Sequence, residues 1–164
     1  MEIRRIMLKY VDAKIVFREI PDEITLAINI SNCPCHCEEC HSPYLADDIG
    51  EPLDLEHLVD LIDANLGITC VCLMGGDSDP SEIDYIAEDI KEYYPELKVG
   101  WYSGRDYISK DINLENFNFI KYGHYDKDKG PLNSKTTNQV MLEIKVIDNK
   151  VFKKDITSKF WGSN

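Results

Sequence analysis

Four short apolar runs, each followed directly by a polar or glycine-rich segment, constrain the fold of this chain most strongly. The runs cover residues 24–30, 68–74, 97–102 and 117–122. The run at 24–30 is almost unbroken, as is typical of a strand that is covered on both faces, and the other three are also expected to form strands. Because helical segments alternate with them over short connections, we expect mostly parallel strands joined by right-handed crossovers. The sequence therefore predicts an α/β fold.

Two segments between these runs have the periodicity and the end signals of helices. Apolar side chains recur at helical spacing over residues 54–66, and Gly67 follows as a C-cap. A second helix is expected to begin after Asp79, which is a good N-cap residue. Pro80 then stands at the first helical position and Glu82 at the third, where both residue types are favoured.

Length and composition limit the architecture and the classes of function. The 164 residues are expected to form a single domain, 1–164, which is shorter than the roughly 250 residues of a complete (β/α)8 barrel. A β-hairpin at 140–155, turning at Asp148–Asn149, is expected to close the chain. The net charge of −12 argues against nucleic acid as a partner, because phosphate groups would be repelled.

The sequence also predicts where the protein is found. It contains no run of about 20 apolar residues that could cross a bilayer, and charges interrupt the N-terminal segment where a signal peptide would be apolar. We therefore expect a cytoplasmic protein without a membrane partner. In a reducing compartment, the six cysteines are expected to be metal ligands, redox groups or core residues rather than disulfides.

The segments that follow the four apolar runs contain most of the chemically distinctive residues. They comprise residues 33–41, 75–80, 103–106 and 123–130. Parallel strands bring their carboxyl ends to one edge of the sheet, where ligands bind in folds of this kind. We therefore expect a ligand site at this edge.

The cysteine-rich segment after the first run has the spacing of a metal-cluster loop. Cys33, Cys37 and Cys40 form a C-x3-C-x2-C pattern. Three thiolates on one short loop can hold three irons of a 4Fe–4S cubane, since cysteine thiolate is the usual ligand of such clusters. No cysteine of this pattern is left for the fourth iron, which predicts an open coordination position. We interpret Cys35 as a spectator thiol.

Zinc is the alternative metal. A structural zinc site uses four ligands, and the obvious second pair would be Cys70 and Cys72. We expect the side chains of these two residues to point to opposite faces of a strand, so that they cannot bind the same ion. We therefore interpret both as core residues. His36 and His41 could also bind a metal, and His41 has the better case because it follows the last thiolate.

These motifs together resemble the radical S-adenosylmethionine superfamily. In that superfamily, the amino and carboxylate groups of S-adenosylmethionine chelate the open iron of the cluster. The resemblance implies that Gly75, Gly76 and Asp77 bind the methionine amino group, because the superfamily has Gly-Gly-Glu or Gly-Gly-Asp there. Ser103 and Arg105 resemble a position that contacts the ribose or carboxylate of the cofactor.

The end of the cysteine loop is assigned by the same resemblance. Cofactor contacts are expected from Glu39, Cys40 and His41. The position before the third cysteine is commonly aromatic or glycine in the superfamily, whereas this chain has Glu39. A cofactor contact at that position is therefore expected from the backbone.

A closer resemblance covers residues 24–139. The segment 119–139, the sequence GGDSDP and the sequence WYSGR are similar to those of the activating proteins of anaerobic, class III ribonucleotide reductases. This resemblance implies a partial, open (β/α) barrel that holds a 4Fe–4S cluster and S-adenosylmethionine. A flavodoxin-like or ferredoxin-like donor would reduce the cluster. A 5'-deoxyadenosyl radical would then take a hydrogen atom from a glycine of the partner, an anaerobic ribonucleoside-triphosphate reductase.

Two alternatives to this function are kept open. The chain could be another small radical S-adenosylmethionine enzyme that acts on a metabolite or peptide, or a non-catalytic module that binds zinc or stores iron. Eight carboxylates and one lysine between Asp77 and Glu96 predict an acidic helix, which we interpret as a solvated face or a docking surface. The polar residues 133–139 are interpreted as a loop that borders the site or faces a partner.

Overall fold

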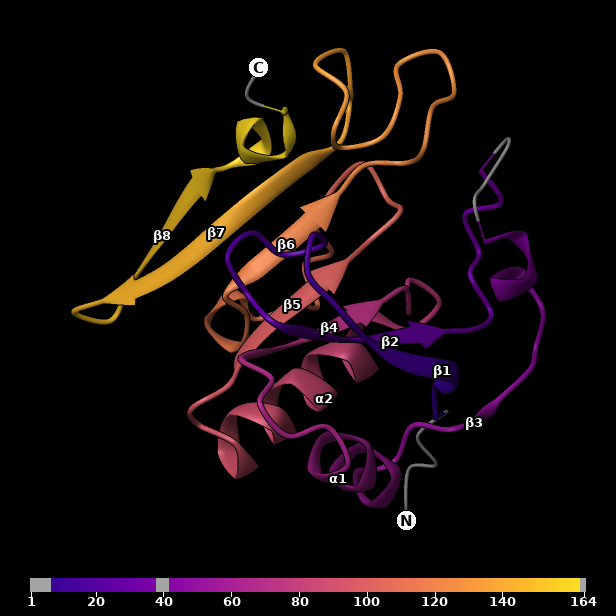
Figure 1. Ribbon diagram of the computed structural model, residues 1–164, viewed down its shortest axis with the longest axis vertical. Coiled ribbons are helices and arrows are strands. Elements are labelled where there is room, and N and C mark those ends of the chain that lie inside the picture. The colour runs from indigo at the N-terminus through magenta and orange to yellow at the C-terminus, as the bar shows by residue number, and fades with distance from the viewer. Residues whose placement is uncertain (1–6, 38–41, 163–164) are drawn as a thin grey trace.

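The computed structural model describes residues 7–37 and 42–162, which form a mixed α/β fold. In this part of the chain one sheet contains eight strands, in the order β3-β1-β2-β4-β5-β6-β7-β8 (Figure 1). The strands are β1 (Lys9–Val16), β2 (Thr25–Ile30), β3 (Glu51–Pro52), β4 (Cys70–Met74), β5 (Lys98–Tyr102), β6 (Phe119–Tyr122), β7 (Val140–Ile147) and β8 (Lys150–Asp155). The helices are α1 (Leu55–Asp63), α2 (Pro80–Tyr93) and three 3-10 turns at Pro43–Ala46, Leu114–Asn116 and Thr157–Phe160.

The prediction of mostly parallel strands is correct only for the centre of the sheet. Strands β2, β4, β5 and β6 run parallel, whereas β1 and β3 on one side and β7 and β8 on the other pair antiparallel. Four of the seven strand pairings in the described residues are therefore antiparallel. The flanks differ because their strands return through turns or loops, which allow antiparallel pairing without a crossover helix.

The four predicted apolar runs form the four parallel strands, and both predicted helices are present. Asp79 caps α2 by accepting a hydrogen bond from the Glu82 backbone N–H at 3.2 Å. Helix α1 ends at Asp63, earlier than predicted, and Gly67 lies in the loop beyond it with a φ of +90°. The hairpin β7–β8 turns at Asp148 and Asn149, as the sequence predicts, and both residues have positive φ.

The sheet separates two apolar clusters. Both helices pack on one face, where α1 and α2 contribute Leu58, Ile62, Ile83, Ile86 and Ile90. The other face is covered by loop and turn residues, among them Ile20, Leu132 and Ile156. The helix-free face is the one on which several site residues described below lie.

The expectation that Cys70 and Cys72 point to opposite faces is wrong. Both thiols are fully buried in the cluster on the helix-free face, together with Phe119 and Met141. Residues two apart in a strand share a face, since side chains alternate with every residue. This burial confirms their assignment as core residues, and it raises the pKa of each thiol, that of Cys70 to about 12.

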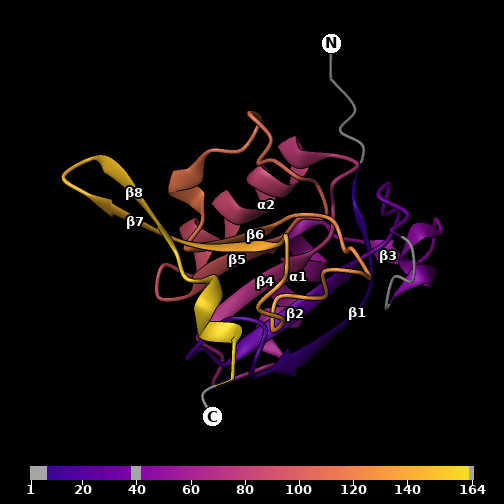
Figure 2. The ribbon, with the colours of Figure 1, turned by 90° about the horizontal axis from the view of Figure 1, so that it is seen from above.

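The C-terminal hairpin extends beyond the rest of the sheet (Figures 1 and 2). Every residue from 145 to 155 is exposed, and β8 forms one edge of the sheet. None of the helices in the described part of the chain has the length and apolar character needed to cross a membrane.

Candidate functional site

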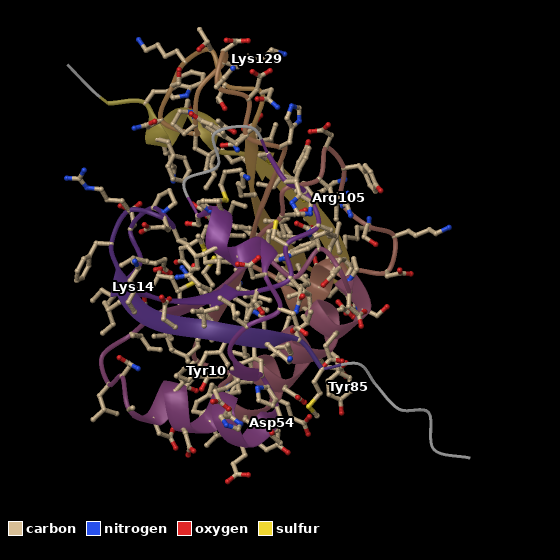
Figure 3. All side chains as sticks on the ribbon, turned by 90° about the vertical axis from the view of Figure 1, so that its right-hand side faces the viewer. Tyr10, Lys14, Asp54, Tyr85, Arg105 and Lys129 are labelled. Atoms are coloured by element: carbon tan, nitrogen blue, oxygen red, sulfur yellow. The ribbon has the colours of Figure 1, made fainter. Side chains whose placement is uncertain are left out.

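The carboxyl ends of β2, β4, β5 and β6 meet at one edge of the sheet, as predicted. The cysteine segment after β2 contacts the segments after β4 and β5, because Cys35 Sγ lies 3.7 Å from Asp77 Oδ2 and beside Gly104. The segment after β6 joins them, since the Gly123 N–H donates a hydrogen bond to the Arg105 carbonyl at 2.5 Å. Arg105 lies toward the same end of the molecule as Lys129, away from Asp54 and Tyr85 (Figure 3).

The turn after β4 can be formed only by glycine. Gly75 and Gly76 have φ values of +113° and +90°, which other residues rarely adopt. A Cβ atom on Gly76 would lie 2.3 Å from Ile83 Cδ1, so helix α2 leaves no room for a side chain. The Trp101 indole N–H donates to the Gly75 carbonyl at 2.7 Å and fixes the turn to β5. This turn places the next residue, Asp77, at the sheet edge.

Asp77 is buried and its two carboxylate oxygens accept hydrogen bonds from the segment after β5. Only 6% of the surface of Asp77 is exposed to solvent. The Ser103 hydroxyl donates to Oδ1 at 2.6 Å, and the Gly104 N–H donates to Oδ2 at 2.8 Å. Two charge-assisted bonds therefore hold the carboxylate in one orientation. Oδ1 can still accept a further bond, because a carboxylate oxygen has two lone pairs, whereas Oδ2 also accepts a bond from the Cys35 thiol at 3.7 Å.

The cysteine loop is tied to the segment that follows it. The Cys33 N–H donates to the Leu45 carbonyl at 2.8 Å, and the Asn32 N–H donates to the Asp47 carbonyl at 3.1 Å. Within the loop, His36 adopts a positive φ of 45°. Cys33, Cys35 and Cys37 are half-buried and form no disulfide. Metal ligands on such a loop would be accessible without being fully solvated.

Hydrogen bonding within the loop distinguishes two of its thiols. A hydrogen bond with Cys35 lowers the pKa of Cys33 to about 6, which favours the thiolate of Cys33. The same hydrogen bond, burial and the nearby Asp77 charge raise the pKa of Cys35. Thiolate is the form of cysteine that binds metals. Cys35 was interpreted from the sequence as a spectator thiol, and in the structure it is the cysteine that lies against Asp77.

Three of the predicted site residues, Glu39, Cys40 and His41, lie outside the described residues. In residues 7–37 and 42–162, the structure contains no cluster of three potential metal ligands. The described donors agree with a cluster site as far as they extend, because Cys33 and Cys37 lie on one half-buried loop and Cys33 favours the thiolate. These two residues could hold two of the irons of a cubane cluster.

Ser103 and Arg105, the predicted residues after β5, differ in their environment. Ser103 is buried and binds Asp77, and its hydroxyl oxygen also accepts a bond from the Arg105 N–H at 3.1 Å. The Arg105 side chain is exposed, and its charge acts on the Cys35 thiol by favouring the thiolate. Ser103 therefore organises the site from within, whereas Arg105 lies at its rim.

The sequence interpretation missed Lys121, which lies in β6 and is 8% exposed. Its ammonium group donates to the Ser103 carbonyl at 3.1 Å and to the Gly123 carbonyl at 2.9 Å. Burial lowers its pKa to about 8, although the charges of Asp77 and the cysteine loop act in the opposite direction. The signal in the sequence was a lysine inside a predicted buried strand. Lysine is rarely buried without partners, so this position indicates compensating groups nearby.

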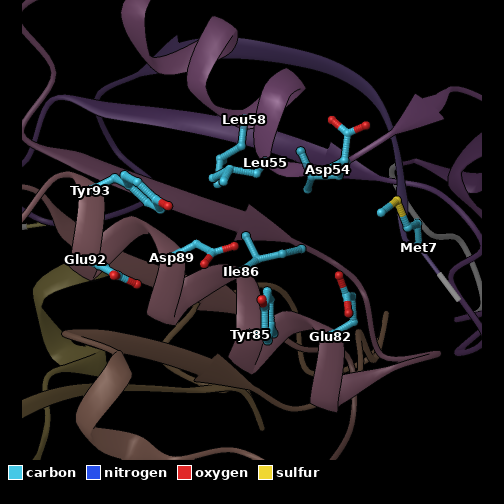
Figure 4. Close-up of a pocket in the computed structure, with 11 residues that line it drawn as sticks. Met7, Asp54, Leu55, Leu58, Glu82, Tyr85, Ile86, Asp89, Glu92 and Tyr93 are labelled. Carbon is cyan, nitrogen blue, oxygen red and sulfur yellow. The ribbon is translucent and has the colours of Figure 1, made fainter. Parts of the chain in front are cut away.

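A groove on the described structure lies away from this site. It has a volume of about 500 Å³, opens between α1 and α2, and is lined by apolar and acidic side chains that include Leu58, Ile86, Asp89 and Tyr93 (Figure 4). None of the predicted site residues lines it. The candidate site is therefore defined by its side chains and not by this groove.

Comparison with known proteins gave no match: no protein-family model fits the chain, and no curated protein or solved structure is significantly similar to it.

Proposed function

We propose that this protein is a radical S-adenosylmethionine enzyme that activates an anaerobic ribonucleotide reductase by generating a glycyl radical on it. One observation carries the proposal: the C-x3-C-x2-C loop begins directly after β2, and its described residue Cys35 lies against Asp77, at the edge where the Gly75-Gly76-Asp77 turn and Ser103 meet. Chance would distribute these motifs over the whole surface. A fold with parallel strands brings them together, and ligands bind at such edges.

Each described residue has a defined task in this proposal. Cys33 and Cys37 hold a 4Fe–4S cluster, together with Cys40. Gly75 and Gly76 let the cofactor approach the backbone, and Asp77 accepts hydrogen bonds from the methionine ammonium group. When bound, the cluster and S-adenosylmethionine would supply radical chemistry through the reductive cleavage of a carbon–sulfur bond. Ser103 and Gly104 keep the Asp77 carboxylate oriented for its contact.

The proposed architecture is a partial, open (β/α) barrel. Its support is the set of parallel strands β2, β4, β5 and β6, which have both helices on one face and bring their carboxyl ends to one edge of the sheet. An incomplete wall allows a loop of a large partner to reach the cofactor, whereas a closed barrel suits a small substrate. The partner is the anaerobic ribonucleoside-triphosphate reductase, and the electron comes from a flavodoxin-like or ferredoxin-like donor in the cytoplasm.

Anaerobic reconstitution with iron and sulfide tests this function. We expect about four irons per chain, a brown chromophore, and cleavage of S-adenosylmethionine to methionine and 5'-deoxyadenosine after reduction with dithionite. With the reductase present, a glycyl radical should form on that partner. Colourless protein that holds a single zinc ion would reject the proposal. Cofactor cleavage without radical transfer to the reductase would favour an enzyme acting on a metabolite or peptide.

Cysteine variants test the choice of ligands. Cys37→Ala is expected to lose the cluster, whereas Cys35→Ala is expected to keep it, because only the first removes a thiolate of the C-x3-C-x2-C pattern. Iron content and the absorption spectrum after reconstitution measure both. Cys70→Ala is the control, since its thiol is fully buried in the core. Equal iron loss from Cys35→Ala and Cys37→Ala would show that the ligand triad is wrong.

A further inference from the structure

Lys121 is a buried cation that the proposed function does not yet use. In the described part of the chain it is the only basic side chain that is buried. It lies in β6, in the central parallel part of the sheet, on the face opposite the helices. Burying an ammonium group is costly unless hydrogen bonds and nearby negative charge compensate. The surroundings of Lys121 supply both kinds of compensation.

The hydrogen bonds of Lys121 join two ends of the candidate site. Its Nζ donates to the carbonyl of Ser103 after β5 and to the carbonyl of Gly123 after β6. The ring of Tyr102 lies beneath the ammonium group, with 5.8 Å from Nζ to the ring centroid. The Gln139 side chain also donates to the Gly123 carbonyl, at 3.4 Å. Lys121 thereby fixes the position of Ser103, whose hydroxyl holds Asp77.

The negative charge near Lys121 comes from the site itself. The groups that act on it electrostatically are Asp77 after β4 and the cysteines of the loop after β2, namely Cys33, Cys35 and Cys37. A chain of contacts connects Lys121 with these groups: its Nζ binds the Ser103 carbonyl, the Ser103 hydroxyl binds Asp77, and Asp77 Oδ2 lies 3.7 Å from Cys35 Sγ. A cation in this place offsets the charge of anionic ligands more strongly than a solvated one, because screening by water is reduced.

We propose that Lys121 is a positioning and electrostatic residue of this site, which raises the reduction potential of an iron–sulfur cluster held by the cysteine loop. The inference rests on the proposed function. The step it affects is the uptake of one electron by the cluster from an external donor, which is oxidised by one electron, with no bond made or broken. The ammonium charge stabilises the reduced cluster, which carries one more negative charge than the oxidised cluster.

The test is a redox titration of the reconstituted protein, followed by paramagnetic resonance without S-adenosylmethionine. Lys121→Met keeps most of the side-chain volume and removes the charge. We expect the ratio of reduced to oxidised cluster at a fixed potential to fall about tenfold, which is about 59 mV for one electron. Lys121→Arg retains the charge and should stay within about twofold of the wild type. Lys91→Met is the matched control: Lys91 is a half-buried lysine bonded to Asn118, away from the site, and its loss should change nothing.

Two results would overturn the inference. One is an unchanged potential in Lys121→Met, and the other is an equal shift in Lys121→Met and Lys121→Arg, which would indicate a purely structural role. If Lys121→Met does not hold a cluster, the same redox titration is carried out on Asp77→Asn, for which the opposite shift is expected. Removing that carboxylate charge should raise the reduced fraction, and a fall or no change would contradict the electrostatic account.

The failure of this inference can be distinguished from the failure of the proposed function. If the wild-type protein takes up no cluster, the proposed function is wrong and the inference fails with it. If the wild-type protein is loaded and cleaves S-adenosylmethionine but Lys121→Met has the wild-type potential, only the inference is wrong.

Discussion

Gly76 shows how a single residue shapes the site. Gly76→Ala must place a methyl group 2.3 Å from Ile83 Cδ1 at a φ of +90°. We expect a loss of about 2–4 kcal/mol in the free energy of unfolding, from backbone strain and overpacking together. Gly67→Ala is the matched control, because Gly67 has the same φ but no atom within 4 Å of an added Cβ. It should lose only about 1 kcal/mol. Urea denaturation measures both variants, and similar losses would contradict the packing argument.

The role of Asp77 is tested by a variant that removes its charge but keeps its shape. Asp77→Asn retains an oxygen that can accept the Gly104 N–H bond, so the fold and the cluster should survive. Binding of S-adenosylmethionine to the reconstituted protein should weaken about 10- to 100-fold, since hydrogen bonds to charged groups contribute about 1.5–3 kcal/mol. Equilibrium dialysis with labelled cofactor measures the affinity. Wild-type affinity would remove Asp77 from the binding site.

Individual residues were predicted from the sequence unevenly. The Gly-Gly-Asp turn could be predicted because strand ends and glycines follow simple backbone rules, whereas the bond between Ser103 and Asp77 was not predicted. The position of Cys35 against Asp77 could not be predicted, since spacing within a loop does not say which thiol turns inward. Lys121 was missed because local sequence gives no information on the partners that compensate a buried charge.

At the level of single elements, the start of helix α1 gives a pH-dependent prediction. The Asp54 carboxylate accepts bonds from the His57 N–H at 2.9 Å and contacts the His57 ring at 2.6 Å. Hydrogen bonds from His57 lower the pKa of Asp54, and the hydrogen bond to Asp54 raises the pKa of His57. The raised histidine pKa stabilises the fold below about pH 6.5, and this contribution is lost as the pH rises through the folded value. The lowered Asp54 pKa contributes above about pH 3.9 and is lost on acidification.

The difference in stability between the wild type and His57→Ala should therefore be largest at about pH 5.5 and smaller at about pH 8. Urea denaturation at the two pH values measures it. Asp54→Ala is the reference, because it also removes the N-cap bond to the backbone and should cost about 1 kcal/mol even at the higher pH. A His57→Ala effect that grows with pH would contradict the assignment.

The elements that the sequence reveals are those with a strong local pattern. Strands β2, β4, β5 and β6 were predicted because they are buried on both faces and therefore almost wholly apolar. The segment KYVDAKIV of β1 was not, since it is a half-exposed strand whose charged residues interrupt the apolar pattern. Two-residue β3 carries no signal of its own and exists through pairing with β1. Pairing of this kind depends on tertiary contacts.

At the scale of the whole molecule, the topology explains why the candidate site is where it is. The central parallel strands bring their carboxyl ends together, both helices cover one face, and the antiparallel flanks extend the sheet beyond the site. The sequence predicted the parallel centre from alternation, but it could not predict which strands add at the edges. The pairing of the edge strands depends on the loops and turns that connect them. These segments have a similar composition whether the next strand pairs parallel or antiparallel.

The central claim is that the cysteine loop holds a 4Fe–4S cluster with one open iron, next to Asp77 and Ser103. The most direct test is the paramagnetic resonance spectrum of the dithionite-reduced, reconstituted protein with and without S-adenosylmethionine. The account predicts the signal of a reduced 4Fe–4S cluster that changes when the cofactor is added, because the cofactor binds the open iron. The same spectrum in both samples, or no cluster signal in either, would contradict it.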